Sequence, residues 1–144
     1  MQREIRVCEP LDPPIAALTI NSALFLSNAI RKDTKVVVNV KEYGVVIIEG
    51  WNARRVYPDS ESLIGMFRAL KRGKRLRGVT LQEKCPEEPP FTKFCGELGG
   101  SKLGYLIDPL GCEGLDIYEI DQRVAILNIE LDRALKDLDL FTTS

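Results

Sequence analysis

Hydrophobic and polar residues follow two different periods along this 144-residue chain, and the two periods alternate. Short runs rich in Val and Ile, bounded by turn-forming residues, predict strands, because β-branched side chains favour a pleated, half-buried backbone. Strands are predicted over residues 4–8, 35–40, 45–49, 78–82, 103–107 and 115–120. The segment Lys41-Glu42-Tyr43-Gly44 is predicted to be a turn between two of them.

Apolar residues at helical spacing predict helices between these strands. The first covers residues 15–32. Residues 9–14 before it are expected to form a stiff loop without helix, because proline removes a backbone donor and restricts the chain. The second helix begins at Asp59 or Ser60, either of which is a good N-cap, and runs to about Lys71.

The third predicted helix, over residues 121–138, carries an apolar stripe that is broader than one packing partner needs. That breadth favours contact with a second subunit, so a homodimer is expected. Strands that alternate with helices predict one α/β domain over residues 1–144, with a mostly parallel sheet flanked by helices. Ligands bind at the carboxyl ends of parallel strands, which directs attention to the proline-containing loop at 9–14 and to the turn at 107–111.

Composition limits the chemistry that the chain can perform. The net charge of −1 means that any nucleic-acid contact must come from a local patch. The chain has no histidine, which excludes histidine-based triads, general bases and metal sites. No run approaches the roughly 18 apolar residues of a membrane helix, and the amino terminus lacks the layout of a secretory signal, so a cytoplasmic protein is expected.

Four cysteines, at positions 8, 85, 95 and 112, do not form a Cys-x-x-Cys pair, so no zinc site is predicted. Reduced thiols are the default expectation for a cytoplasmic chain. A second interpretation is that Cys85 and Cys95, which flank a proline-rich loop, close it with a disulfide, as occurs in intracellular proteins of hyperthermophiles.

A basic run without any intervening acid follows the second predicted helix, and it is the best candidate for binding RNA phosphates. It consists of Arg68, Lys71, Arg72, Lys74, Arg75 and Arg77. Other basic residues that could extend it are Arg31, Lys32, Arg54 and Arg55, and Trp51 could stack on a base. For the basic run the alternative is a solvated helix end, where the dipole favours cations. For Trp51 it is a core or interface tryptophan.

Four segments resemble the TrmY family of tRNA pseudouridine N1-methyltransferases, within the knotted SPOUT superfamily. Residues 23–33 (ALFLSNAIRKD) are similar to the family's FFLSHDIRRD, and VYPD at 56–59, before a helix with RAL at 68–70, is similar to VSPDE and KKAL. YLIDPLG at 105–111 resembles the cofactor loop FIIGDHIG, and LDR at 131–133 resembles the closing LDK. The segments occur in the family's order along nearly the whole chain.

This resemblance implies a C-terminal trefoil knot, a homodimer and S-adenosylmethionine as cofactor. It places the cofactor against Leu106, Ile107, Asp108 and Gly111, with Gly99 and Gly100 as further candidates. It makes Asp12 the candidate catalytic residue, which would orient the base or accept its proton while the enzyme aligns donor and acceptor. The expected substrate is structured RNA, with the pseudouridine of a tRNA as the expected target.

Three hypotheses stay open at this point. The first is a methyltransferase of that kind. The second is a degenerate relative that binds RNA or a partner protein without catalysis, because the chain is shorter than the family, has Ile107-Asp108 where the family has Gly-Asp, and lacks an arginine beside Asp12. The third is an α/β domain that is structural or binds a small ligand, with the resemblance accidental. For Asp12 itself, the alternative is that it only caps a proline-rich turn.

Overall fold

The computed structural model describes residues 3–26, 29–86, 92–93, 106–108 and 119–142. Within these residues the chain forms a six-stranded sheet with the strand order β6-β5-β4-β1-β8-β7 and a separate two-stranded hairpin. The sheet strands are β1 (Arg3–Leu11), β4 (Thr34–Val40), β5 (Gly44–Glu49), β6 (Val79–Gln82), β7 (Thr92–Lys93) and β8 (Leu106–Asp108). The hairpin consists of β2 (Phe25–Leu26) and β3 (Ala29–Ile30).

The sheet is mixed, which corrects the expectation of a mostly parallel one. β1 is parallel to both of its neighbours, β4 and β8, and β8 is parallel to β7, whereas β5 is antiparallel to β4 and to β6. The antiparallel half arises because the predicted turn is a tight hairpin. In this turn Glu42 (φ 73°) and Gly44 (φ 126°) take the left-handed backbone conformations that such a reversal needs. The α/β class itself is confirmed.

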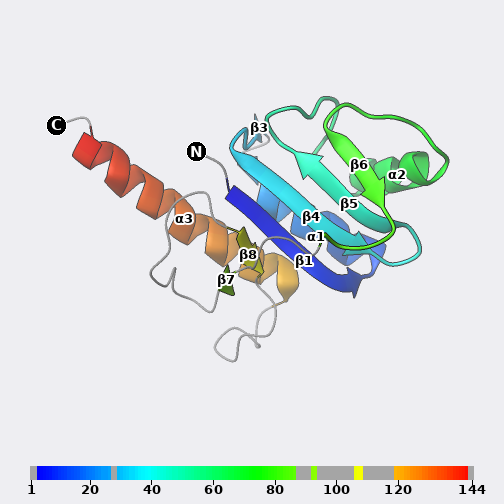
Figure 1. Ribbon diagram of the computed structural model, residues 1–144, viewed down its shortest axis with the longest axis horizontal. Helices are drawn as coiled ribbons and strands as arrows, with labels where there is room; N and C mark the ends of the chain where they lie inside the picture. The colour runs from blue at the N-terminus through cyan, green and yellow to red at the C-terminus, as the bar shows by residue number, and fades with distance from the viewer. Residues whose placement is uncertain (1–2, 27–28, 87–91, 94–105, 109–118, 143–144) are drawn as a thin grey trace.

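Three helices accompany the sheet: α1 (Pro13–Leu24), α2 (Ser60–Lys71) and α3 (Ile120–Thr142). In the view of Figure 1, α1 and α2 lie behind the sheet, and α1 contacts both of the other helices. The core fills the space between this helical layer and the sheet. Val36 and Val38 of β4 point into it, while Val37 between them points to the opposite face, as the pleat of a strand requires.

The ends of α1 differ from the prediction. Pro13 and Pro14 occupy its first turn, where a missing N–H costs no helical hydrogen bond, so the expectation that prolines exclude a helix there is wrong. β1 correspondingly extends to Leu11. The helix ends at Leu24 because the chain turns into the β2–β3 hairpin, whose Arg31 N–H donates to the Leu24 carbonyl oxygen.

A buried polar cluster attaches α3 to the start of the sheet. Arg3, only 5% exposed, donates to the side-chain oxygen of Asn128 at 3.0 Å and forms ion pairs with Asp132 and Asp33 at 3.0 Å each. Asn128 also donates to two carbonyl oxygens near the end of α1, and Arg31 pairs with Asp132 at 2.8 Å. These contacts fix α3 by matched polar groups as well as by apolar packing.

The broad apolar stripe of α3 divides into a buried and an exposed part. Val124, Leu127 and Leu131 are buried in the core, whereas Ile129 is 51% exposed. The side chains of the last turns lie outside the described residues, so the predicted subunit contact stays a prediction.

Several other predictions concern the second half of the chain. The short strand β7 lies within a segment that was expected to be a loop, and β8 confirms the end of the predicted 103–107 strand. The strand predicted over 115–120 is wrong at Ile120, which begins α3, and residues 115–118 lie outside the described residues. The expected C-terminal knot stays a prediction, because residues 94–105 and 109–118 likewise lie outside the described residues.

The cysteine pairing differs from both expectations. Cys85 forms a disulfide with Cys8, not with Cys95, and the Cα atoms of the pair are 5.9 Å apart. The chain leaves β6 at the edge of the sheet and crosses the face away from the helices, where Cys85 packs against Val37, Val45 and Ile47. The sequence separation of 77 residues gave no local signal for this pairing.

Candidate nucleic-acid interface

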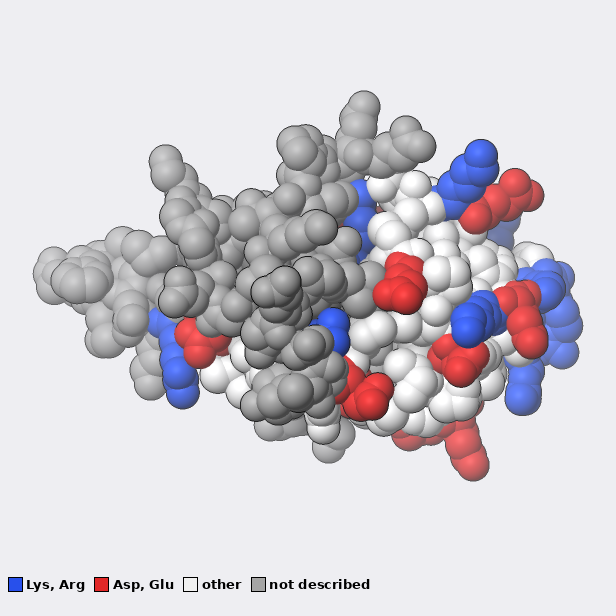
Figure 2. Space-filling view, turned by 90° about the horizontal axis from the view of Figure 1, so that it is seen from below, with Lys and Arg blue, Asp and Glu red and all other residues white. Residues whose placement is uncertain are grey.

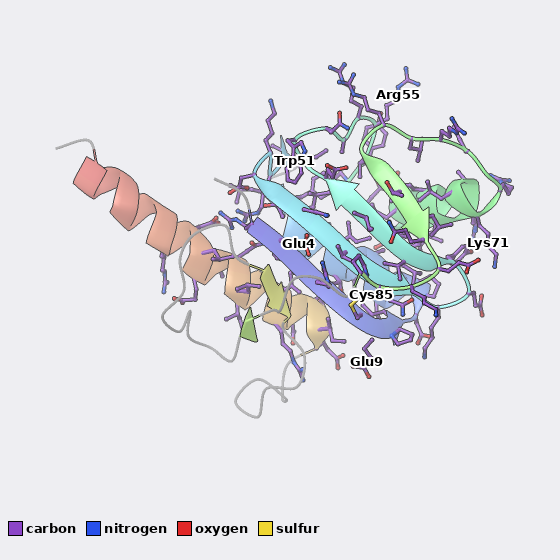
Figure 3. All side chains as sticks on the ribbon, viewed as in Figure 1. Glu4, Glu9, Trp51, Arg55, Lys71 and Cys85 are labelled. Atoms are coloured by element: carbon purple, nitrogen blue, oxygen red, sulfur yellow. A yellow bond between two sulfur atoms is a disulfide. The ribbon has the colours of Figure 1, made fainter. Side chains whose placement is uncertain are left out.

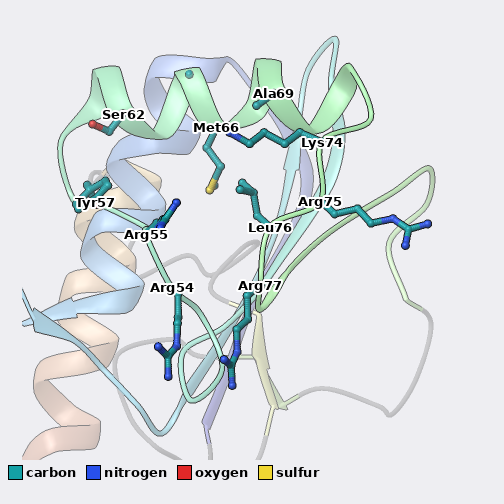
Figure 4. A pocket seen from close by; sticks show the side chains of 11 residues that line it. Arg54, Arg55, Tyr57, Ser62, Met66, Ala69, Lys74, Arg75, Leu76 and Arg77 are labelled. Carbon is teal, nitrogen blue, oxygen red and sulfur yellow. The ribbon is translucent and has the colours of Figure 1, made fainter.

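A cavity of about 610 Å³ lies between α2 and two neighbouring segments, 54–57 and 74–77 (Figure 4). We call it the basic pocket. Its floor and its α2 side are small or apolar, with Gly65, Met66, Ala69 and Leu76. Five cations line it as well: Arg54, Arg55, Lys74, Arg75 and Arg77. The remaining lining residues are Tyr57 and Ser62, so no carboxylate of the described residues lines the pocket.

Two glycines hold the 50–57 segment against the sheet. A Cβ at Gly50 would lie 2.1 Å from the Arg31 carbonyl oxygen, and one at Gly78 (φ +77°) would lie 2.4 Å from the Ala53 nitrogen. Glycine is therefore required at both positions, because any side chain would separate the backbones.

Backbone hydrogen bonds then bring the two basic segments together. The Glu49 N–H donates to the Gly78 carbonyl oxygen at 2.9 Å, and the Arg54 N–H donates to the Arg77 carbonyl oxygen at 3.3 Å. As a result, the side chains of Arg54 and Arg77 lie beside each other and point the same way (Figure 4).

Arg55 adopts a strained backbone conformation at the pocket wall. Its φ of 58° lies in the left-handed region, which costs a non-glycine residue roughly 1–2 kcal/mol. Strain of this kind persists only where the surroundings hold it, and it is concentrated at functional sites.

The cations of the pocket are poorly neutralised. The ion pairs found among the described residues do not involve any of its five basic side chains. Arg77 donates through Nε to the side-chain oxygen of Asn52 at 3.1 Å, a neutral partner. Cations held together without counter-charges repel one another. A bound anion offsets this repulsion and is attracted by all of them, so such a cluster favours anion binding.

The structure divides the predicted basic run into two groups. Lys74, Arg75 and Arg77 line the pocket, and Arg54 and Arg55, which were proposed as an extension, join them. The other members do not line it. Arg68 and Arg72 are exposed at the end of α2, and the Lys71 ammonium donates to the Glu42 carbonyl oxygen and lies 5.4 Å from the centre of the Tyr43 ring.

The other proposed extension is not part of the pocket. Arg31 is engaged by Asp132, and Lys32 is exposed outside the pocket lining. Trp51 is 40% exposed and also lies outside the lining, so it is not the core tryptophan that was considered. Sequence reasoning missed Tyr57, which is 56% exposed and lines the pocket; its position next to the VYPD proline gave no sign of this role.

Asp12 lies at the other end of the sheet from the basic pocket. It follows β1 at the N-cap of α1, where its side chain makes no capping hydrogen bond, and it pairs with Lys41 at 3.4 Å. Both side chains are largely exposed. Asp12 lies near the end of β1, where the Lys41 N–H donates to the Leu11 carbonyl oxygen. The pocket adjoins Glu49, which pairs with Lys35 of β4, and Lys35 in turn pairs with the start of β1. The two sites therefore lie at opposite ends of the strands.

Of the predicted cofactor residues, Leu106 and Ile107 pair with Glu4 and Ile5 of β1, and β7 pairs with the other side of β8. Their backbone groups therefore belong to the sheet ladder up to Asp108. Because β8 is parallel to β1, its carboxyl end points toward the end of the sheet where Asp12 lies, but the pairing stops at Ile107 opposite Ile5, seven residues before Asp12. Gly111, Gly99 and Gly100 lie outside the described residues.

Other surfaces are less uniform than the pocket. The face seen in Figure 2 carries acidic and basic side chains next to one another. In Figure 3, Arg55 and Lys71 lie well apart, with Lys71 beside α2. Among the described residues, no group of three or more cysteine, aspartate or glutamate side chains could hold a metal ion, and no described helix is long and apolar enough to cross a membrane.

The fold and site together define an α/β protein with a mixed sheet and a cation-rich pocket beside α2. The sequence matches no model of a known protein family and no curated protein. The function is therefore argued from the site itself.

Proposed function

We propose that this protein binds structured RNA through the phosphates that the basic pocket attracts. The observation that carries the proposal is the convergence of five cations from two separate segments on one cavity without a lining carboxylate. Phosphate contacts by Lys and Arg supply most of the affinity of such complexes, and they do not require a basic protein overall. A net charge of −1 fits a local patch of this kind.

RNA is favoured over a small anion by the shape of the site. The pocket is open, and the exposed cations Arg68 and Arg72 continue from it along the end of α2. An extended anion with regularly spaced charges would contact both the pocket and this continuation, whereas one phosphate or sulfate ion would occupy a fraction of it.

The test is the salt dependence of binding to a folded tRNA transcript, measured by filter binding. Simultaneous Lys74→Glu and Arg75→Glu should lower affinity at least tenfold and flatten the plot of log affinity against log salt by about one to two units, because each lost phosphate contact removes about 0.7–0.9. The control is Arg133→Glu, a cation on α3 that is also exposed and pairs with Glu130. Equal effects of both changes, or none, would refute the assignment.

Methyl transfer from S-adenosylmethionine to that RNA is the second candidate function, in line with the resemblance to the TrmY family. It is supported by the parallel course of β1 and β8, which directs the carboxyl end of β8 toward the end of the sheet where Asp12 follows β1. Asp12 would orient the base or take its proton, and the segment after Asp108 would hold the cofactor. A knotted C-terminal part, a homodimer and a cytoplasmic location belong to the same proposal.

Isothermal titration with S-adenosylmethionine, followed by a methylation assay on tRNA, tests this candidate. Asp12→Ala should abolish methyl transfer but leave cofactor binding intact. Lys41→Ala is the matched control, since it breaks the same 3.4 Å ion pair and leaves the carboxylate in place. RNA binding without cofactor binding would leave a non-catalytic RNA-binding protein. Sedimentation of Ile129→Lys against the unaltered protein tests the dimer.

A further inference from the structure

The basic pocket has features that phosphate binding does not explain. Contacts to phosphates need only exposed cations, yet this pocket has an apolar floor in which Met66 is 8% exposed and Leu76 is partly buried. Its volume of about 610 Å³ falls within the range of roughly 300–1,000 Å³ that is typical of small-molecule sites. A cavity of this size is large enough for a nucleobase with its sugar.

One side of the cavity is open because of Gly65. This residue lies within α2, where glycine is less favourable than alanine by about 1 kcal/mol, and it lines the pocket. A Cβ built at this position meets no atom within 4 Å. Space beside α2 is thus left unfilled at a position where a larger residue would stabilise the helix.

The walls offer an aromatic ring and a hydrogen-bond donor. Tyr57 is 56% exposed at one side of the cavity. The side chain of Lys74 runs beneath α2 toward Met66, so its ammonium group reaches over the apolar floor (Figure 4). Arg54 and Arg77 lie below, at the mouth.

We propose that the basic pocket receives a single unstacked nucleotide of the RNA. The base stacks on Tyr57 above the apolar floor, Lys74 donates to an acceptor on the base edge, and Arg54 and Arg77 hold the flanking phosphates. Unpaired bases of RNA loops are recognised by stacking of this kind, whereas a base that is stacked and paired inside a duplex is not free to enter the cavity. The inference rests on the proposed function, because the same cations bind the RNA.

The experiment compares a hairpin RNA that has an unpaired loop with a fully paired duplex of equal length, at one salt concentration. The unaltered protein should prefer the hairpin. Tyr57→Ala should weaken hairpin binding about 10- to 100-fold, the usual effect of removing one base–aromatic stack, and leave duplex binding unchanged. Tyr57→Phe should keep the preference, since the ring remains.

Gly65→Leu is an independent variant that fills the cavity and raises helix propensity, so loss of folding does not explain its effect. It should also abolish the preference for the hairpin. Trp51→Ala is the control, because this aromatic residue is 40% exposed on the same loop but outside the pocket lining. A larger loss for Trp51→Ala than for Tyr57→Ala would overturn the assignment of the stacking residue.

The outcomes separate this inference from the proposed function. Absence of binding to either RNA would refute both. Equal binding of hairpin and duplex, unaffected by Tyr57→Ala and Gly65→Leu, would refute the nucleotide site and leave phosphate binding in place. If a nucleoside 5′-monophosphate bound as tightly as the hairpin, the pocket would be a site for free nucleotides, and the inference would also fail.

Discussion

Removal of the Cys8–Cys85 disulfide should cause a large loss of stability. The bond joins the end of β1 to the segment after β6, so it connects opposite parts of the sheet in the fold and closes a loop of 77 residues in the unfolded chain. A cross-link restricts the unfolded ensemble more strongly as the closed loop becomes longer.

The loop length sets the magnitude. The chain-entropy relation gives about 4.5 kcal/mol at 25 °C for a separation of 77 residues. The bridge between Cys85 and Cys95 that the sequence suggested would close only ten residues and contribute about 2.7 kcal/mol by the same relation. With a urea dependence of about 2 kcal/mol per molar, the observed pairing corresponds to a midpoint shift of about 2 M.

Urea unfolding of the oxidised protein, of Cys8→Ser and of Cys95→Ser measures this difference. Cys8→Ser should unfold about 2 M earlier, and a reducing agent should move the oxidised protein to the same midpoint. Cys95→Ser is the matched control and should unfold like the unaltered chain. A loss in Cys95→Ser instead, or the same midpoint in all three, would refute the pairing, and peptide mapping without reduction would identify the bonded cysteines directly.

Three further outcomes are expected from purified variants. Asp59→Ala should lower the melting temperature at neutral pH, because the Asp59 carboxylate accepts the Ser62 N–H at the start of α2. That hydrogen bond lowers the carboxyl pKa below 3.8, so its stabilising contribution is present above pH 3.8 and is lost as the pH falls through the lowered pKa. Asp59→Asn should keep the cap without this acid dependence. Asn128→Ala should cost about 2–3 kcal/mol in urea unfolding, since it leaves Arg3 and two carbonyl groups short of partners; a loss below 1 kcal/mol would contradict the buried cluster. Gly78→Ala should weaken both folding and RNA binding, because its Cβ would clash with the backbone of Ala53. Gly73→Ala, also at positive φ but in open space, should lower stability by only about 1–2 kcal/mol and leave RNA binding intact. Equal effects in the two variants would contradict this account.

Local sequence signals predicted the parts of the fold that local physics determines. The strands at 35–40 and 45–49 and the α2 helix with its Asp59 cap agree with the structure closely, because β-branched runs, a tight turn and a capping side chain each act over a few residues. The predicted 15–32 helix was too long for the same reason. Leu26 and Ile30 continue a helical spacing, but they lie in the strands of the β2–β3 hairpin. Directly after this hairpin, Arg31 forms its ion pair with Asp132 of α3, a tertiary contact that helical spacing does not reveal.

Long-range arrangements were beyond such signals. The basic run was recognised as a candidate RNA surface, yet only part of it lines the pocket, since the backbone contact between Arg54 and Arg77 selects which cations converge. Tyr57 and Gly65 gained their roles from the same convergence, and nothing in their own sequence neighbourhood marks them. The Cys8–Cys85 pairing likewise depends on a crossing of the sheet face that no local pattern records.

The positions of the two candidate sites restrict how one RNA could use both. The basic pocket adjoins the end of β5, whereas Asp12 follows the end of β1 at the opposite end of the strands. Between them runs α2. Its last turn reaches the end of the sheet where Asp12 lies, because the Lys71 ammonium donates to the Glu42 carbonyl oxygen in the β4–β5 turn. An RNA that placed one nucleotide in the pocket and presented another to Asp12 would therefore follow the cations at the end of α2. In a protein that only binds RNA, these cations would extend the phosphate contacts of the pocket. Methyl transfer would give them a second role, because they would guide the RNA from the pocket to Asp12.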